Sequence, residues 1–192
     1  MRSPRRAKLA ATSSLKAFYL SHFSQPACER ILYRIIQKNK IKRILELGLG
    51  DGQRAVRMIE MAQRQSPECR ISYAGTDLFE SRSQTTRPGV TLKAAYQMLG
   101  ATGARIHLIP GDPFSALSRT ANTLSGTDLV VISACEDQQS SERAWFYLPR
   151  VIHPNSLVVR EENRSGGATE MRLLGTTEIV QLASEQATRR AA

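Results

Sequence analysis

The chain has 192 residues, of which 41% are hydrophobic and 23% charged, and its formal net charge is +10. This length and composition predict a single folded domain with a substantial core and exclude a disordered chain. The longest apolar runs are far too short to cross a bilayer, so no membrane-spanning segment is expected.

The surplus of positive charge belongs to one segment. Residues 1–43 hold 11 Lys and Arg residues and one acid, whereas the rest of the chain holds 16 of each sign. A basic segment can bind nucleic acid or another polyanion, or it can be a solvated tail followed by a helix whose basic last turn complements the helix dipole. Its Arg and Ser content also fits an organelle transit peptide. We expect residues 1–12 to form a basic tail and residues 13–192 a single domain.

The cysteines and histidines indicate the compartment and the absence of a metal. Cys28, Cys69 and Cys135 form no CxxC pair and leave an odd number of thiols, which suits a reducing compartment. The first residues lack the continuous apolar segment of a secretory signal. The sequence therefore predicts a cytoplasmic protein, and no histidine is spaced as a metal ligand would be.

Short apolar strands alternate with helices along the chain. Residues 17–40 carry apolar side chains near helical spacing, with Pro26 marking a start. The predicted strands that follow are residues 41–48, 70–77, 104–111, 127–134 and 156–162. The predicted helices between them are residues 53–65, 90–102 and 140–152, and residues 112–126 are predicted to form a short helix and a loop.

Buried strands separated by helices predict an α/β fold: a doubly wound, mostly parallel sheet with helices on both faces. Such sheets bind ligands outside the carboxyl ends of their strands. The turn after the fifth strand leaves no room for another crossover helix, so residues 169–175 are predicted to form an antiparallel edge strand in a shortened C-terminal part. Residues 176–192 fit either a last strand or, rather better, a closing helix.

The stretch "RILELGLGDG" (residues 43–52) holds three glycines on alternate positions between a predicted strand and a predicted helix. Without a Cβ at Gly48, Gly50 and Gly52, backbone amides and a helix N-terminus can approach a ligand closely. The glycines could also merely form a tight turn. A dinucleotide fingerprint needs its third glycine where this chain has Gln53, so NAD-linked oxidoreduction is disfavoured.

With Glu46 inside the strand, the pattern Glu-x-Gly-x-Gly-x-Gly resembles the first motif of the class I S-adenosylmethionine-dependent methyltransferases. The likeness continues at three further strand ends, "AGTDLFE", "PGDPFSAL" and "TDLVVISA", and covers residues 40–160. It implies a Rossmann-like methyltransferase domain, S-adenosylmethionine as the cofactor, and transfer of its methyl group to an acceptor by in-line displacement.

The resemblance also implies a set of cofactor-binding residues. Asp77 would accept hydrogen bonds from the ribose hydroxyls, because a carboxylate is acceptor-only, and Leu78 would pack on one face of the adenine. Ser133 would lie near the far end of the methyl donor. The whole set is Glu46, Gly48, Gly50, Gly52, Asp77, Leu78, Asp112, Pro113 and Ser133.

Several of these residues also have simpler interpretations. Glu46, which in the family faces the donor's amino-acid part or loop amides, could be a structural acid satisfied by its neighbours. Asp77 could cap a turn, and Asp112 is as good a helix N-cap as it is a partner for the adenine amino group. Phe114 could close the adenine pocket, although a core position is more usual for such a side chain.

No acceptor signature is present, so the methyl acceptor and the catalytic residues stay open. The candidates for a base are the acids Glu136, Asp137 and Glu161, which could equally be solvated charges. Cys135 is similar to the nucleophile of 5-methylcytosine enzymes, but no proline precedes it, and an inert side chain is expected. The alternative function is a non-catalytic Rossmann-like protein that binds a ligand or associates with nucleic acid through residues 1–43.

Overall fold

A six-stranded sheet forms the centre of the computed structural model, which describes residues 15, 18–82, 89–134, 138–163 and 169–191. Its strands are β1 (Arg43–Leu47), β2 (Ser72–Asp77), β3 (Arg105–Pro110), β4 (Thr127–Ile132), β5 (Ile152–Asn163) and β6 (Thr169–Leu173). The strand order is β3-β2-β1-β4-β5-β6, and every neighbouring pair is parallel except β5 and β6. The chain therefore winds to one side of β1 first and to the other side from β4 onward.

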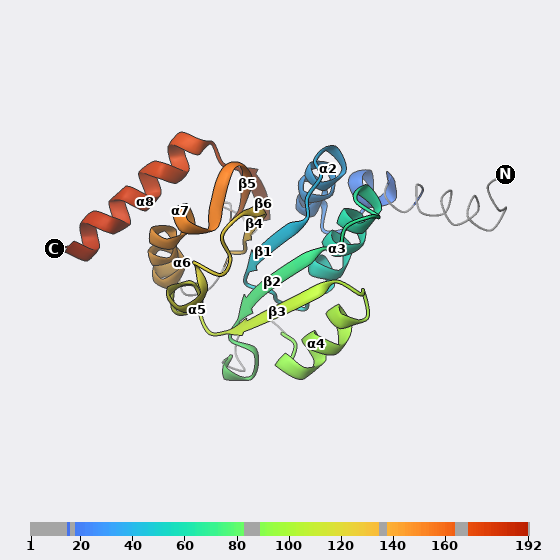
Figure 1. Cartoon of the computed structure of the whole chain (residues 1–192), viewed down its shortest axis with the longest axis horizontal. Helices are drawn as coiled ribbons and strands as arrows, with labels where there is room; N and C mark the ends of the chain where they lie inside the picture. The colour runs from blue at the N-terminus through green and yellow to red at the C-terminus, as the bar shows by residue number, and fades with distance from the viewer. Residues whose placement is uncertain (1–14, 16–17, 83–88, 135–137, 164–168, 192) are drawn as a thin grey trace.

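Helices cover both faces of this sheet (Figure 1). One face carries α2 (Arg30–Lys38), α3 (Gln53–Gln65) and α4 (Leu92–Gly100). The other carries α5 (Pro113–Thr120), α6 (Gln138–Ala144), α7 (Leu148–Val151) and α8 (Thr176–Ala191). Three short 3-10 helices complete the described elements: η1 (Ala27–Glu29), η2 (Phe79–Ser81) and η3 (Trp145–Tyr147).

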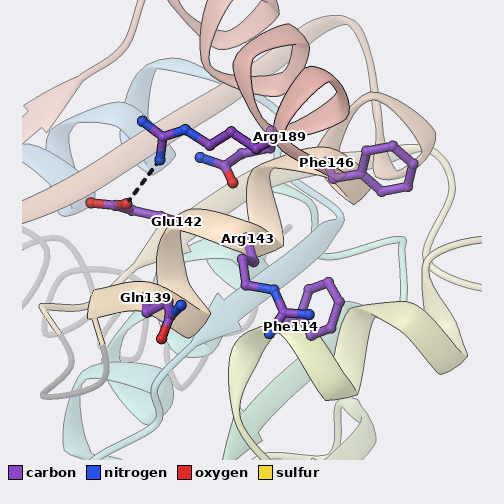
Figure 2. Close-up of a pocket in the computed structure, with 7 residues that line it drawn as sticks. Phe114, Gln139, Glu142, Arg143, Phe146 and Arg189 are labelled. Carbon is purple, nitrogen blue, oxygen red and sulfur yellow. Dashed lines mark ion pairs between the residues drawn. The ribbon is translucent and has the colours of Figure 1, made fainter. Parts of the chain in front are cut away.

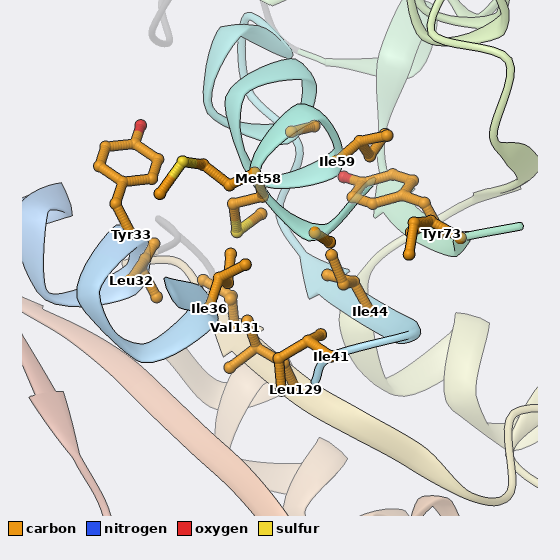
Figure 3. Close-up of a cluster of buried hydrophobic side chains, with 14 of the residues drawn as sticks. Leu32, Tyr33, Ile36, Ile41, Ile44, Met58, Ile59, Tyr73, Leu129 and Val131 are labelled. Carbon is orange, nitrogen blue, oxygen red and sulfur yellow. The ribbon is translucent and has the colours of Figure 1, made fainter. Parts of the chain in front are cut away.

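Each face of the sheet has its own hydrophobic core cluster. In α3 the buried residues Ala55, Met58, Ile59 and Ala62 recur every three or four positions, so one stripe of the helix faces the sheet. Met58 belongs to the same cluster as Ile36 of α2, as Figure 3 shows. A second cluster fills the opposite face beneath α5, η3, α7 and α8. Packing on both faces explains why the central strands are buried along nearly their whole length rather than at alternate positions.

The predicted fold class is confirmed, including the antiparallel pairing of the last two strands. The C-terminal segment, which the sequence allows as strand or helix, is the helix α8. The predicted helix over residues 140–152 is instead divided into α6, η3 and α7. Pro149 contributes to this division, because proline has no N–H to donate and is tolerated only in the first turn of a helix. Strand β5 begins at Ile152, earlier than predicted.

A helical segment that includes residues 18–22 precedes η1. The predicted basic tail, residues 1–12, lies outside the described residues. Within the described part of the chain, no helix combines the length and the apolar character needed to cross a membrane.

Candidate functional site

The candidate site lies at the carboxyl edge of the sheet, around the end of β1. Strand β1 has β2 on one side and β4 on the other, so the crossover connections leave in opposite directions at this point. Doubly wound proteins bind their ligands in the crevice that such a switch creates. The glycine loop, Asp77, Ser133 and Glu161 all lie at this edge and are joined to one another by hydrogen bonds or through Arg54.

The glycines of the loop differ in the space above them. Gly48 and Gly50 both have left-handed backbones, with φ of +94° and +64°, a conformation that favours glycine. A Cβ at Gly48 would lie 2.9 Å from the Cβ of Ser133, and one at Gly52 would overlap the Cε of Met98. A Cβ at Gly50 would meet no atom within 4 Å. Of the three, Gly50 is therefore the glycine whose backbone borders open space that a ligand could enter.

The amides at the start of the loop are already paired within the protein. The N–H groups of Gly48 and Leu49 both donate to the carbonyl of Thr76 at 3.0 Å. The N–H of Gly50 donates to Oδ2 of Asp77 at 2.9 Å. These three amides are not free to hold a phosphate, which distinguishes the loop from the phosphate-binding turns of dinucleotide-binding proteins.

Asp77 ends β2 and is buried. Its Oδ1 accepts from the N–H of Phe79 at 3.1 Å and from the guanidinium of Arg82, while Oδ2 accepts from Gly50. Asp77 therefore does cap the turn that follows it. Because Gly50 is the one donor to Oδ2 among the described residues, this oxygen retains a lone pair for a ligand hydroxyl. The next side chain, Leu78, is 42% exposed and offers an apolar surface beside this carboxylate.

Asp112 is the N-cap of α5. Its carboxylate accepts from the N–H of Ser115 at 3.0 Å and from the hydroxyl of Ser140. Burial tends to raise the pKa of Asp112, but the hydrogen bonds from Ser115 and Ser140 outweigh it and lower the pKa below its ordinary value. Pro113 is buried in the first helical turn. The cap interpretation of Asp112 is thus confirmed, and a contact with adenine stays a prediction.

Glu46, the acid of the motif, is enclosed by protein, with no solvent exposure. One carboxylate oxygen accepts from Nε of Arg54 at 2.6 Å, and the other accepts from the hydroxyl of Tyr73. Burial raises the pKa of Glu46, against the lowering effect of Arg54 and of the Tyr73 hydrogen bond. Burial and the Glu46 carboxylate both raise the pKa of Tyr73, so the phenol keeps its proton and donates it. Side chains rather than loop amides satisfy this acid.

Arg54, the second residue of α3, joins three strand ends. Its Nη1 donates to Glu161 at 3.2 Å, and its Nη2 donates to the carbonyl of Gly48 at 3.3 Å and to the hydroxyl of Ser133. Burial alone would lower the pKa of this guanidinium, but Glu46 and Glu161 raise it above its ordinary value. Arg54 is therefore a permanent positive charge at the edge of the sheet.

Glu161 is the one base candidate that the structure places at this edge. Its Oε2 accepts from Arg54 and also from the N–H of Ala134 at 3.3 Å. Glu136 and Asp137, together with Cys135, lie outside the described residues. Cys28 of η1 lies near the same charges. Burial raises the pKa of its thiol, and the Glu161 carboxylate raises it further.

His153 and Asp128 belong to the opposite, amino edge of the sheet. Asp128 accepts from the N–H groups of Lys42 and Arg43, each at 2.8 Å, and its other oxygen lies 3.1 Å from Nε2 of His153. This cluster fixes the entry of the chain into β1 and does not contribute to the candidate site. Among the described residues, no group of three potential ligands could hold a metal ion.

A cavity of about 300 Å³ lies between α5, α6 and α8 (Figure 2), and Phe114 lines it, whereas the glycine loop, Asp77 and Ser133 do not. The guanidinium of Arg143 lies 3.8 Å from the ring centroid of Phe114, and Arg189 is 3.8 Å from Glu142. The ring of Phe114 also packs against Tyr147, with centroids 5.7 Å apart. Phe114 therefore packs α5 against its neighbours, in line with the core interpretation.

The sequence did not single out three charged or polar members of the site: Arg54, Tyr73 and Arg82. A signal for Arg54 was present, because a carboxylate inside a buried strand requires a partner. An arginine in the first turn of the next helix is well placed to provide it. Tyr73 and Arg82 carried no comparable signal, since a strand tyrosine and a loop arginine are ordinary in sequence.

No protein-family model matches the sequence, and no curated protein matches it. Solved structures do match. An O-methyltransferase from Bacillus cereus in complex with SAH aligns with 100% of this chain and 80% of its own, at 15% identity and a TM-score of 0.54. A putative O-methyltransferase from Klebsiella pneumoniae aligns over the same shares at 14% identity and a TM-score of 0.51. The chain has the fold of the class I S-adenosylmethionine-dependent methyltransferases.

The MycE methyltransferase of the mycinamycin biosynthetic pathway is also matched, at 22% identity and a TM-score of 0.42. That match covers 81% of this chain, and the chain spans 34% of the length of MycE.

Proposed function

We propose that this chain is a methyltransferase that uses S-adenosylmethionine. One observation carries the proposal: the open space above Gly50 adjoins the Asp77 carboxylate, which is bonded to the amide of that same glycine. The exposed apolar side chain of Leu78 follows directly. Gly50 thus allows a ligand to approach the backbone, Asp77 offers a carboxylate, and Leu78 offers an apolar surface. All three lie at the switch point of the sheet, where doubly wound proteins bind their ligands.

In this proposal, each part of the methyl donor contacts a different residue of the site. Asp77 accepts from the ribose hydroxyls, and Leu78 packs on the adenine, whose outer end reaches toward Asp112 and Pro113. The backbone of Gly50 lies under the middle of the ligand. Ser133, at the end of β4, lies toward the end that carries the sulfur and the amino acid.

The chemistry requires orientation above all. The acceptor atom forms its bond to the methyl carbon as the carbon–sulfur bond breaks, and the sulfur leaves as a neutral thioether. Holding the two reactants in line supplies most of the rate enhancement that such a displacement needs. A base is required only where the acceptor must lose a proton. Where a base is needed, its candidates are Glu136, Asp137 and Glu161, of which Glu161 lies at this edge of the sheet.

Thermal unfolding with S-adenosylmethionine, S-adenosylhomocysteine or NAD tests the proposal. A ligand present at a hundred times its Kd stabilises the folded protein by about 2.7 kcal/mol, which raises the Tm of a domain of this size by roughly 5–10 °C. We expect that shift with the two sulfur nucleotides and none with NAD. A protein whose Tm is unchanged by all three ligands would overturn the proposal.

A second candidate function, binding of nucleic acid, is favoured by a surface near the N-terminus. Phe18, Tyr19 and Phe23 are each more than half exposed. The hydroxyl of Ser21, in the same helical segment, donates to Gln37 of α2 at 3.2 Å, so the segment packs against α2, whose Arg34 and Lys38 are exposed. Aromatic rings next to basic groups are the usual composition of surfaces that bind single-stranded nucleic acid.

Fluorescence anisotropy with a single-stranded RNA oligonucleotide tests this second function. We expect binding that weakens as salt rises, because bound counterions are released from the phosphates. The triple variant F18A/Y19A/F23A should bind more weakly, whereas Tyr96→Ala, an exposed tyrosine on α4, should not. Binding that is absent, or equal in the two variants, would exclude this surface.

A further inference from the structure

Arg54 and Glu161 form a charged pair whose chemistry matches one particular part of the methyl donor. We propose that these two side chains bind the amino-acid end of the methyl donor, Glu161 taking the ammonium and Arg54 the carboxylate. This inference rests on the proposed function and assigns to Glu161 and Arg54 the contact that the resemblance implies for Glu46.

Glu46 has no surface from which to touch a ligand. It is 0% exposed, and both of its oxygens are occupied, one by Arg54 and one by Tyr73. Its negative charge instead holds the guanidinium of Arg54 in place. Glu46 is therefore a positioning residue in this protein, and the group presented to the ligand is the one that it positions.

Arg54 has an unused donor on the side of Glu161. Nε donates to Glu46, and the two Nη2 hydrogens have Gly48 and Ser133 as acceptors, but Nη1 has one acceptor, Glu161, among the described residues. A guanidinium carries five N–H donors, so one Nη1 hydrogen remains. The side chain is 11% exposed.

Glu161 has an unused acceptor in the same place. Its Oε2 accepts from Arg54 and from the N–H of Ala134, whereas Oε1 has no hydrogen-bond partner in the described part of the chain. The side chain is 10% exposed. A free donor on a cation and a free acceptor on an anion therefore lie side by side, which is the complement of an α-amino acid zwitterion.

The charges favour the same partner. Glu46 and Glu161 both face the single guanidinium of Arg54, so this cluster holds one negative charge more than it holds positive ones. An ammonium group beside Glu161 would stabilise that carboxylate locally, while the carboxylate of the same ligand end lies toward the guanidinium of Arg54. Because a nearly buried charge is costly without an opposite charge beside it, Glu161 favours an ammonium over an uncharged group at this position.

The position of the pair also fits the length of the ligand. The four groups lie on strands that are successive neighbours in the sheet. Asp77 ends β2, the glycine loop follows β1, Ser133 follows β4, and Glu161 lies near the end of β5. Three strand spacings separate the first from the last, about 14 Å between main chains, and the side chains at both ends reach inward. A donor whose ribose lies at Asp77 therefore extends past Gly48 toward Arg54 and Glu161.

Affinities for two related ligands test the inference. S-adenosylhomocysteine carries the amino-acid end, whereas 5′-methylthioadenosine has the same adenosine and thioether without it. We expect Glu161→Gln to weaken binding of S-adenosylhomocysteine about tenfold to a hundredfold, the range of a hydrogen bond to a charged group, and to leave methylthioadenosine unchanged. The matched control Glu162→Gln removes a neighbouring surface charge that pairs with Arg172, and it should alter neither affinity.

Equal weakening of both ligands by Glu161→Gln, or no weakening of either, would overturn the inference while the proposed function stands. A wild-type protein that binds neither ligand would overturn both. A second comparison needs no variant: the wild-type protein should bind the decarboxylated and the deaminated analogues of S-adenosylhomocysteine at least tenfold more weakly than the parent. Equal affinity for the parent and the analogues would contradict the assignment.

Discussion

The hydroxyl of Tyr73 donates to Glu46 inside the protein, and this hydrogen bond joins the second strand of the sheet to the acid that precedes the glycine loop. Glu46 uses its other oxygen for Arg54. The three side chains thus connect β1, β2 and α3 beneath the candidate site. Because Glu46 and Tyr73 are enclosed and Arg54 is largely so, the network is expected to contribute to stability as well as to the geometry of the site.

Removing the Tyr73 hydroxyl should be costly. In Tyr73→Phe one oxygen of the enclosed Glu46 carboxylate loses its donor, and an unsatisfied buried acceptor costs about 1–3 kcal/mol. Urea unfolding should show a loss of that size. Tyr96→Phe, which removes a hydroxyl from an exposed side chain, is the control and should leave the free energy of unfolding unchanged. Equal stability of the two variants would contradict the role of the hydrogen bond.

Alanine at Gly48 and at Gly50 should have different effects, although both backbones are left-handed. Either substitution costs roughly 1–2 kcal/mol for the conformation alone. At Gly48 the new Cβ would also lie 2.9 Å from the Cβ of Ser133, and such overpacking adds about 1–3 kcal/mol. We therefore expect Gly48→Ala to be the less stable variant by urea unfolding. Gly50→Ala should lose affinity for S-adenosylhomocysteine, since its Cβ enters the open space. The reverse order of stability would contradict this account.

The contribution of Asp112 to stability should depend on pH. Hydrogen bonds to its carboxylate lower its pKa in the folded protein, although burial acts in the other direction. The unfolded chain, with a pKa of about 3.9, binds the proton more tightly. The charge therefore stabilises the fold above that pH, and this stabilisation is lost as the pH falls through the folded pKa.

Asp112→Asn keeps a side-chain oxygen for the cap and removes the charge. The difference in Tm between the wild-type protein and this variant should be largest near neutral pH and should shrink as the pH falls below about 4. A difference that stays constant over that range would show that the charge is not what stabilises the helix start.

Asp77→Ala should weaken binding of S-adenosylmethionine about tenfold to a hundredfold, because charged hydrogen bonds to the ribose are lost. Isothermal titration calorimetry measures this directly. Asp51→Ala removes an exposed acid from the same loop and is the matched control, with little change expected. Unchanged affinity in Asp77→Ala would rule out the ribose assignment.

Elements with a strong local pattern were predictable from the sequence. Helix α3 begins and ends where the pattern of residues 53–65 predicts, because glycines precede it and its apolar stripe is regular. The antiparallel edge followed from the short turn after β5. The break within residues 140–152 was not predicted, because the apolar run of residues 144–148 favoured a continuous helix and the effect of Pro149 was not taken into account.

The site was predictable in its positions and less so in its contacts. Sequence order places Asp77 and Ser133 at strand ends, and parallel strands bring those ends to one edge. The hydrogen-bond partners at this edge depend on long side chains that contact residues of distant strands. Arg54 reaches Glu161 over 107 positions of sequence, and no local pattern records such a contact.

The enclosure of Glu46 has a consequence for protein engineering. The residues that hold the edge of the sheet together, Glu46 and Tyr73, have no exposed surface, whereas Leu78 and Glu161 reach the solvent. A library that varies Leu78 and Glu161 can therefore search for new ligand preferences while the supporting network is left intact. In such a library Glu46 is kept fixed, although it is part of the recognised motif, and Leu78 and Glu161 are randomised.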